Sequence, residues 1–264
     1  MKRIGVEELK QLQIDILDAV HTFCLKHSIN YWLDCGTLLG SVRHKGYIPW
    51  DDDIDIGMLR PDYDKFMRLF NSENKRYQFL CPELNADYSY GAGKVVDTNT
   101  VLYEPDKNGR KLAVNIDVFV YDNAPDEDDE LKKMFDKRDW YRKCSMAHSQ
   151  DHDVVGGIIR NVGFFLIRLY TMPFPKNYFA LKMMENSKRY ATQDTQRVGN
   201  FSSYTRTVGD KNIFASFVDV EFEGKKYKAP VGYDRWLRAF YKDYMKLPPV
   251  EKRISTHTFE AYVK

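Results

Sequence analysis

The strongest constraint in this sequence is a short segment in which acidic and apolar side chains alternate. Residues 51–57 read Asp-Asp-Asp-Ile-Asp-Ile-Gly, and a period of two is typical of a β-strand with one buried face. Asp53 and Asp55 should therefore point to the same side of a strand, where their carboxylates repel each other. A divalent cation with oxygen ligands relieves such repulsion, so the segment predicts a metal site.

Two other interpretations of this segment remain open. A calcium loop of the EF-hand type needs glycine at its sixth position and glutamate at its twelfth, where this chain has Ile56 and Asp62. The alternating isoleucines also favour a strand over such a loop. An acidic edge strand without a ligand fits the spacing as well.

A second predicted strand carries one more acid. Residues 112–120 have one apolar face, whereas the other face carries Asn115, Asp117 and Phe119. We expect this strand to lie in the same sheet as Asp53 and Asp55. Asp117 would then be the third acid of the site.

A turn of small residues precedes the acidic segment. Residues 29–33 predict a short strand, and a helix should begin directly after it, so that free backbone amides are available to phosphate oxygens. The candidate phosphate-binding residues are Gly36, Thr37, Gly40, Ser41 and Arg43. A solvated last turn of the helix explains the basic residues 43–45 equally well.

Length, charge and cysteine spacing define the class of protein. The 264 residues fit a single α/β domain, residues 1–264, in which a small mixed sheet carries the acids and a helical region covers about residues 126–220. The formal net charge of +2 argues against nucleic acid as a partner. Four widely spaced cysteines form no CxxC pair, and the charged N-terminal segment does not look like a signal peptide, so we expect a cytoplasmic protein.

The most apolar segment allows two interpretations. Residues 154–172 include Arg160 and Arg168, so no uncharged run approaches the roughly 18 residues of a membrane-spanning helix. The broad apolar face of residues 154–176 fits a buried core helix. It fits equally well a helix that lies on the inner face of an anionic membrane.

Two stretches of the chain resemble a known family. Residues 31–43, Tyr-Trp-Leu-Asp-Cys-Gly-Thr-Leu-Leu-Gly-Ser-Val-Arg, and residues 48–56, Ile-Pro-Trp-Asp-Asp-Asp-Ile-Asp-Ile, are similar to the LicD phosphocholine transferases and their fukutin-related relatives. Residues 115–119 and 233–249 also resemble that family, and the likeness is weakest over 125–220. The chain lacks the cysteine-rich zinc-binding insertion of the animal relatives, so bacterial enzymes are the better comparison.

The resemblance implies a nucleotidyltransferase fold in which Asp53 and Asp55 bind Mg²⁺ (or Mn²⁺) and Asp117 supplies the third acid. It also implies a CDP-alcohol donor, whose phospho-alcohol, with phosphocholine as the first choice, passes to a hydroxyl of a cell-surface glycan. Such an acceptor would be a lipopolysaccharide or teichoic-acid precursor, often lipid-linked, and CMP would be released. Other CDP-alcohols (ribitol, glycerol or ethanolamine), transfer of the nucleotide itself, and a non-catalytic nucleotide- or metal-binding module are the alternatives.

Two further residues become candidates through this comparison. Lys94 lies in a predicted strand at a position where the family suggests a phosphate contact, although a lysine on an edge strand is an equally good explanation. Choline needs an aromatic cage, for which Trp50 is the candidate. The aromatic residues of 236–244 have helical spacing and are expected to belong to the core.

Overall fold

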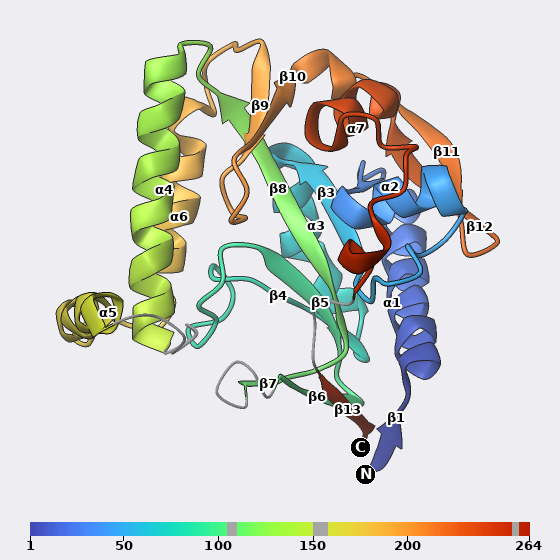
Figure 1. The fold of residues 1–264 in the computed structure, drawn as a ribbon, viewed down its shortest axis with the longest axis horizontal. Coiled ribbons are helices and arrows are strands. Elements are labelled where there is room, and N and C mark those ends of the chain that lie inside the picture. The colour runs from blue at the N-terminus through green and yellow to red at the C-terminus, as the bar shows by residue number, and fades with distance from the viewer. Residues whose placement is uncertain (105–109, 150–157, 255–258) are drawn as a thin grey trace.

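The computed structural model of this protein describes residues 1–104, 110–149, 158–254 and 259–264. Its centre is a seven-stranded mixed sheet, which confirms the predicted α/β class (Figure 1). The long strand β8 (Asn115–Ala124) runs parallel to β3 (Asp55–Leu59) on one edge. Its other edge pairs antiparallel first with β5 (Gly93–Asp97) and then with β9 (Arg197–Asn200). The sheet is completed by β2 (Trp32–Leu33) beside β3, β4 (Tyr77–Leu80) beside β5 and β10 (Thr207–Asp210) beside β9.

Helices cover this sheet where the apolar periodicity predicts them. Apolar residues recur at helical spacing over residues 6–27, which predicts a helix, and α1 (Val6–Lys26) confirms it. Phe23 of α1 meets Phe66 and Phe70 of α3 (Arg60–Glu73) edge to face, with ring centroids 5.6 and 5.0 Å apart. These contacts join the two helices in the main hydrophobic core.

The predicted helical region divides into two parts. Its first part forms α4 (Asp128–Ser149), α5 (Ile158–Thr171), α6 (Tyr178–Ser187) and the short η2 (Lys188–Tyr190). Its second part returns to the central sheet as β9 and β10, which the sequence pattern did not indicate. None of the helices in the described ranges is long and apolar enough to cross a membrane.

Smaller elements frame the sheet. A four-stranded sheet joins β1 (Lys2–Ile4), β13 (Glu260–Val263), β6 (Thr100–Glu104) and β7 (Arg110–Leu112), so both chain ends lie side by side in Figure 1. β11 (Phe217–Phe222) and β12 (Lys225–Pro230) form a hairpin. The remaining elements are α2 (Cys35–His44), η3 (Lys211–Phe214), α7 (Tyr233–Tyr241) and η4 (Val250–Lys252).

A buried carboxylate fixes the start of α2. Asp34 is the N-cap residue, and its Oδ1 accepts hydrogen bonds from the backbone amide of Cys35 at 2.9 Å and from Nε1 of Trp236 at 3.3 Å. Its Oδ2 accepts from the hydroxyl of Tyr121 at 2.6 Å. Burial raises the pKa of Asp34. This one side chain therefore connects α2, β8 and α7.

A buried ion pair holds the opposite side of β8. Nε and Nη2 of Arg60 each donate to one carboxylate oxygen of Asp122 at 2.7 Å, and Nη2 also donates to Oγ of Ser187 at 3.1 Å. Both charged residues are buried. The pair thus links α3, β8 and α6 at a site where either charge alone would lack solvation.

We expect Arg60→Met to lower the free energy of unfolding by about 3–5 kcal/mol, because it leaves the Asp122 carboxylate buried without a partner. Replacing both partners, as Arg60→Met with Asp122→Leu, should recover much of that loss. Chemical denaturation measures both effects. The matched control is Lys132→Met, because Lys132 pairs with Asp136 at the same 2.7 Å but on the surface, and its loss should be much smaller than that of Arg60→Met. Equal losses in the buried and the surface variants would contradict this prediction.

Candidate active site

The carboxyl-rich segment and β8 open onto a cavity of about 610 Å³. One wall carries acids from the segment before β3, from β3 itself and from β8. The opposite wall is formed by α4 and by the loop between β9 and β10. The acidic residues that line the cavity are Asp51, Asp52, Asp53, Asp55 and Asp117.

The pairing of β3 with β8 confirms that the two acidic strands are neighbours. Asp55 stands directly opposite Asp117 in the parallel register. Asp53 precedes β3 instead of belonging to it, yet it lines the same cavity. Asp55 is only 8 % exposed, and burial, followed by the charges of Asp53 and Asp117, raises its pKa well above the ordinary value. The cavity therefore concentrates negative charge at a point where the fold does not fully neutralise it.

The two alternatives to a ligand site do not describe this segment. β3 lies between β2 and β8, so it is not an edge strand. An EF-hand loop would extend without regular structure from residue 51 to 62, whereas residues 55–59 form β3 and α3 begins at Arg60. The calcium-loop interpretation is therefore wrong.

Lys94 occupies the wall beside Asp117. Its ammonium group forms an ion pair with Asp117 and donates to Oδ1 of Asn115 at 3.0 Å. The two charged residues also stand opposite each other in the pairing of β5 with β8. Because β5 is flanked by β4 and β8, the edge-strand explanation of Lys94 is wrong.

The acids supply the carboxylate oxygens that a divalent cation binds, but their present arrangement does not form a complete metal site. In the described ranges, no three histidine, cysteine, aspartate or glutamate side chains are placed to hold a metal ion together. The Asp117 carboxylate is engaged by Lys94. Asp53, which is half-buried, and Asp55, which is buried, still offer the hard oxygen ligands that Mg²⁺ binds. The metal site remains a prediction.

The candidates of the turn and of α2 separate into two groups. Gly36 lines the cavity, where a side chain would bring its Cβ to 2.6 Å from Oδ2 of Asp51. Thr37 is buried and does not line the cavity, and its Oγ1 accepts a hydrogen bond from the backbone amide of Asp55 at 2.8 Å. Thr37 therefore positions the acid rather than facing the space in front of it.

The other three candidates of α2 lie outside the cavity lining. Gly40 packs against the backbone of Gly46. Ser41 is fully buried and donates to the carbonyl of Leu38 at 2.8 Å. Arg43 donates to the carbonyl of Tyr244 at 2.8 Å, so it links α2 to the C-terminal region. Its side chain is therefore not simply solvated at the last turn of the helix.

The aromatic candidate also lies outside the main cavity. Trp50 lines an adjoining hollow that shares Asp51 and Asp52 with the cavity, and the Arg253 guanidinium lies 5.7 Å from its ring centroid. Trp236 is buried, as expected for a core residue, but Tyr241 from the same helix lines the main cavity.

The sequence of this chain is similar to those of known proteins. A family model described as LicD/FKTN/FKRP, nucleotidyltransferase domain, matches residues 28–177. The lipopolysaccharide cholinephosphotransferase LicD of Haemophilus influenzae is 30 % identical over 278 residues, which cover 100 % of both chains. The chain belongs to the LicD family. The ribitol 5-phosphate transferases FKRP of human and mouse are each 42 % identical over 45 residues, 17 % of this chain and 9 % of theirs.

Sequence reasoning missed the second wall of this LicD-family cavity. α4 contributes Arg142, Ser145 and Ser149, and the loop after β9 contributes Ser202, Ser203, Tyr204 and Thr205. On α4 these residues form a polar stripe at helical spacing, but a helix that only faces solvent has the same pattern. In the loop the sequence feature is a run of residues with hydroxyl side chains. Nothing in the sequence pattern alone showed that these two segments face the acids.

We expect Asp55→Asn to raise the apparent melting temperature of the metal-free protein by about 2 °C or more, because it removes a buried charge beside two others. A raised carboxyl pKa makes the folded state lose stability as the pH rises above about 4, so the advantage of the variant should grow between pH 5 and pH 8. Thermal melts with a chelator and with Mg²⁺ test this.

Mg²⁺ should stabilise the wild type more than Asp55→Asn. Asp62→Asn is the control, because Asp62 lies on α3 outside the cavity lining, and it should respond to Mg²⁺ like the wild type. An Asp55→Asn protein that melts lower than the wild type at pH 8 and keeps the full Mg²⁺ response would refute the acidic site.

Proposed function

We propose that this protein transfers a phospho-alcohol from a CDP-alcohol to a hydroxyl of a glycan and releases CMP. The observation that carries the proposal is the register that sets Asp55 beside Asp117 in a cavity of a LicD-family chain. The relatives support the reaction class, because their names describe a cholinephosphotransferase and a ribitol 5-phosphate transferase. Phosphocholine and a lipopolysaccharide or teichoic-acid precursor are the first donor group and acceptor to test.

Each acid has a place in the proposed reaction. Asp53 and Asp55 would hold Mg²⁺ or Mn²⁺, which when bound neutralises charge on the donor diphosphate. The Thr37 hydroxyl fixes the backbone at Asp55. Asp117 lies across the strand pair and would accept the proton of the acceptor hydroxyl. The acceptor oxygen then forms a bond to the phosphorus of the phospho-alcohol, and the bond from that phosphorus to the CMP oxygen breaks.

Lys94 contacts Asp117 from the neighbouring strand. Its ammonium group orients the Asp117 carboxylate and places positive charge on the cavity wall. A phosphate oxygen of the donor could share that charge. Gly36 lets the Asp51 carboxylate approach the start of α2 closely, since a Cβ there would lie 2.6 Å from its Oδ2.

The lining of the cavity favours choline among the candidate alcohols. Phe119, Tyr204 and Tyr241 line the same space as the acids, and aromatic faces attract quaternary ammonium groups. These residues replace Trp50 as the aromatic candidates, because Trp50 lies in the adjoining hollow.

We expect Asp53→Asn, Asp55→Asn and Asp117→Asn each to abolish transfer while leaving folded protein. Asp117→Asn should weaken binding of CDP-choline with Mg²⁺ less than Asp53→Asn, because the third acid acts mainly on the acceptor hydroxyl. Turnover assays with mass spectrometry of the products, together with calorimetry, measure both effects, and Asp62→Asn is the matched control. Pyrophosphate instead of CMP would indicate nucleotide transfer. Absence of turnover with every CDP-alcohol would favour a non-catalytic binding module.

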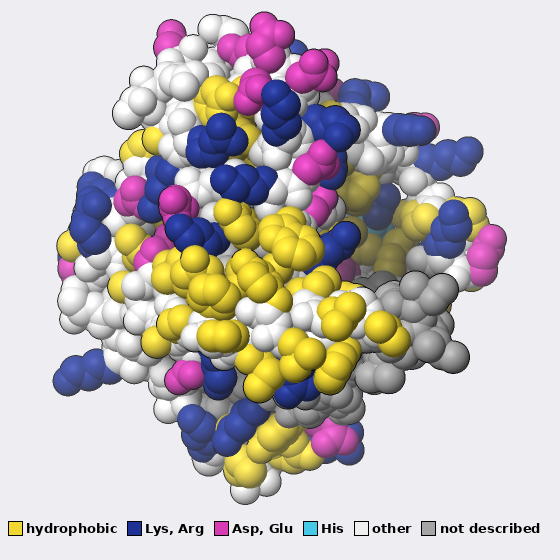
Figure 2. Space-filling model, turned by 90° about the vertical axis from the view of Figure 1, so that its left-hand side faces the viewer, with side chains coloured by type: hydrophobic (Ala, Val, Ile, Leu, Met, Phe, Trp, Pro, Cys, Tyr) yellow, Lys and Arg dark blue, Asp and Glu magenta, His cyan; other side chains and the backbone are white. Residues whose placement is uncertain are grey.

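The described part of α5 presents its apolar residues to solvent. They are between 50 % and 61 % exposed and comprise Val162, Phe165, Leu166, Leu169, Tyr170 and, just after the helix, Met172. Figure 2 shows apolar side chains gathered on this side of the molecule with Lys and Arg side chains around them. Residues 154–157 of the predicted segment lie outside the described residues. The core-helix interpretation is therefore wrong for this face.

We propose that this face rests on the anionic inner leaflet of a membrane, where a lipid-linked acceptor would be found. Apolar side chains bordered by cations such as Arg168 and Lys176 match such a surface. The pair of Lys176 with Asp87 is exposed and does not remove this charge from the surface.

We expect the protein to cosediment with vesicles that contain phosphatidylglycerol, with binding that weakens as salt rises. Phe165→Ser with Leu169→Ser should reduce this binding while turnover of a soluble acceptor survives. The control is Val250→Ser with Ile254→Ser, which removes exposed apolar residues elsewhere and should leave vesicle binding intact. A wild type that ignores the vesicles at low salt would refute the membrane contact.

A further inference from the structure

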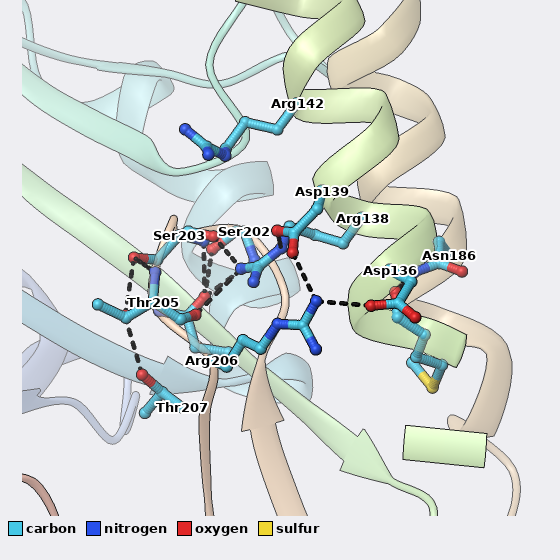
Figure 3. A network of polar contacts seen from close by, with 12 residues as sticks. Asp136, Arg138, Asp139, Arg142, Asn186, Ser202, Ser203, Thr205, Arg206 and Thr207 are labelled. Carbon is cyan, nitrogen blue, oxygen red and sulfur yellow. Dashed lines mark hydrogen bonds and ion pairs between the residues drawn. The ribbon is translucent and has the colours of Figure 1, made fainter. Parts of the chain in front are cut away.

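One face of α4 fixes the loop that forms the far wall of the cavity. Arg138 is fully buried, and its guanidinium donates to the carbonyl oxygens of Ser203 and, at 3.0 Å, Thr205 (Figure 3). Arg206, at the end of this loop, pairs with Asp136 at 2.6 Å and with Asp139 at 2.8 Å. Two arginines therefore hold the hydroxyl-bearing loop against α4. Arg138 reaches from the helix to the loop, and Arg206 reaches from the loop to the helix.

The same helix fixes a second segment of the wall two turns further on. Oγ of Ser145 donates to the carbonyl of Ser89 at 2.5 Å. Ser89, Tyr90 and Gly91 follow in the cavity lining. Arg138 and Ser145 thus have structural partners on either side of residue 142.

Arg142 lies between these two anchors and has a different environment. It extends from the same side of α4 as Arg138 and lines the cavity (Figure 3). Its Nε is buried and has no hydrogen-bond partner, while Nη1 contacts only the sulfur of Met146, a weak acceptor, at 3.3 Å. Within the described residues no carboxylate lies within ion-pair distance of Arg142, whereas the other lining cation, Lys94, is paired with Asp117.

An arginine in this state is suited to an anionic ligand. Leaving the buried Nε–H of Arg142 unbonded is costly, and the cost is recovered when an oxyanion accepts from it. The planar fork of donors matches a phosphate group, and Ser203 and Thr205, whose hydroxyls lie 3.3 Å apart, line the same wall. Ser202 also lines it, but its hydroxyl donates to Oδ1 of Asn200 at 2.8 Å.

We infer that Arg142, with the hydroxyls of the neighbouring loop, forms a phosphate-binding subsite on the wall opposite the acids. The inference deepens the proposed function and rests on it for the source of the phosphate. That phosphate belongs either to the nucleotide of the donor or to a phosphorylated acceptor, and both present the same chemistry to the guanidinium. A cavity with acids on one wall and this arginine on the other would orient its substrate by charge.

The test uses the full chain with Mg²⁺ and four proteins: wild type, Arg142→Met, Arg142→Lys and Lys143→Met. Lys143 is the matched control, because it is the next residue on α4, is exposed and does not line the cavity. Calorimetry measures the binding of cytidine, of CMP, and of inorganic phosphate to the free and to the CMP-saturated protein. Thermal melts check that each variant is folded.

A donor phosphate would make Arg142→Met bind CMP about 10- to 100-fold more weakly while cytidine binding stays unchanged. An acceptor phosphate would leave CMP binding intact and remove the binding of inorganic phosphate to the CMP-saturated protein. In either case Arg142→Lys, which keeps the charge but loses the fork, should fall between wild type and Arg142→Met.

Failure of the subsite and failure of the proposed function give different results. If the wild type binds inorganic phosphate through Arg142 but ignores CMP, the subsite stands and the CDP-alcohol donor is wrong. If folded Arg142→Lys and Arg142→Met bind every probe as the wild type does, the subsite is refuted. The same conclusion follows if Lys143→Met shows equal losses, or if the wild type binds neither CMP nor phosphate.

Discussion

The parallel pairing of β3 with β8 is the constraint on which the site depends. It sets Asp55 against Asp117, and Asp53 reaches the same cavity from the preceding segment. A shift of one residue would turn every side chain of β3 to the other face of the sheet, so the register alone decides whether the acids meet. Burial, followed by the charges of Asp53 and Asp117, raises the pKa of Asp55, and a bound cation would offset both effects.

Two buried carboxylates outside the cavity lining fix the strand that carries Asp117. The Asp34 carboxylate accepts three hydrogen bonds, and Asp122 receives two bonds from Arg60. Both residues contact or belong to β8, so the strand that carries Asp117 is fixed on two sides. The acids gathered on one wall and the buried, unbonded Nε of Arg142 on the other are the places where we expect a ligand to bind.

The sequence was sufficient for features that depend on local periodicity. The alternation around Asp55 predicted a strand, and the apolar spacing before residue 27 predicted α1 almost to its ends. The neighbouring position of Asp117 followed from two strands with the same two-faced pattern. Side-chain partners were less accessible: Ser41 and Thr37 both look like phosphate ligands, yet one hydroxyl bonds its own helix and the other bonds the backbone of Asp55.

The wall opposite the acids was beyond sequence reasoning because contacts far apart in the chain create it. Arg138 holds residues 203 and 205, Arg206 pairs with α4, and β9 joins β8, so several long-range contacts bring a loop from beyond α6 to the cavity. α4 also packs against α5, whose apolar face is exposed. One helix therefore carries the proposed phosphate subsite on one side and supports the proposed membrane-facing helix on another. If both proposals hold, an acceptor anchored in the leaflet would reach the acids by passing α4, the helix that carries Arg142.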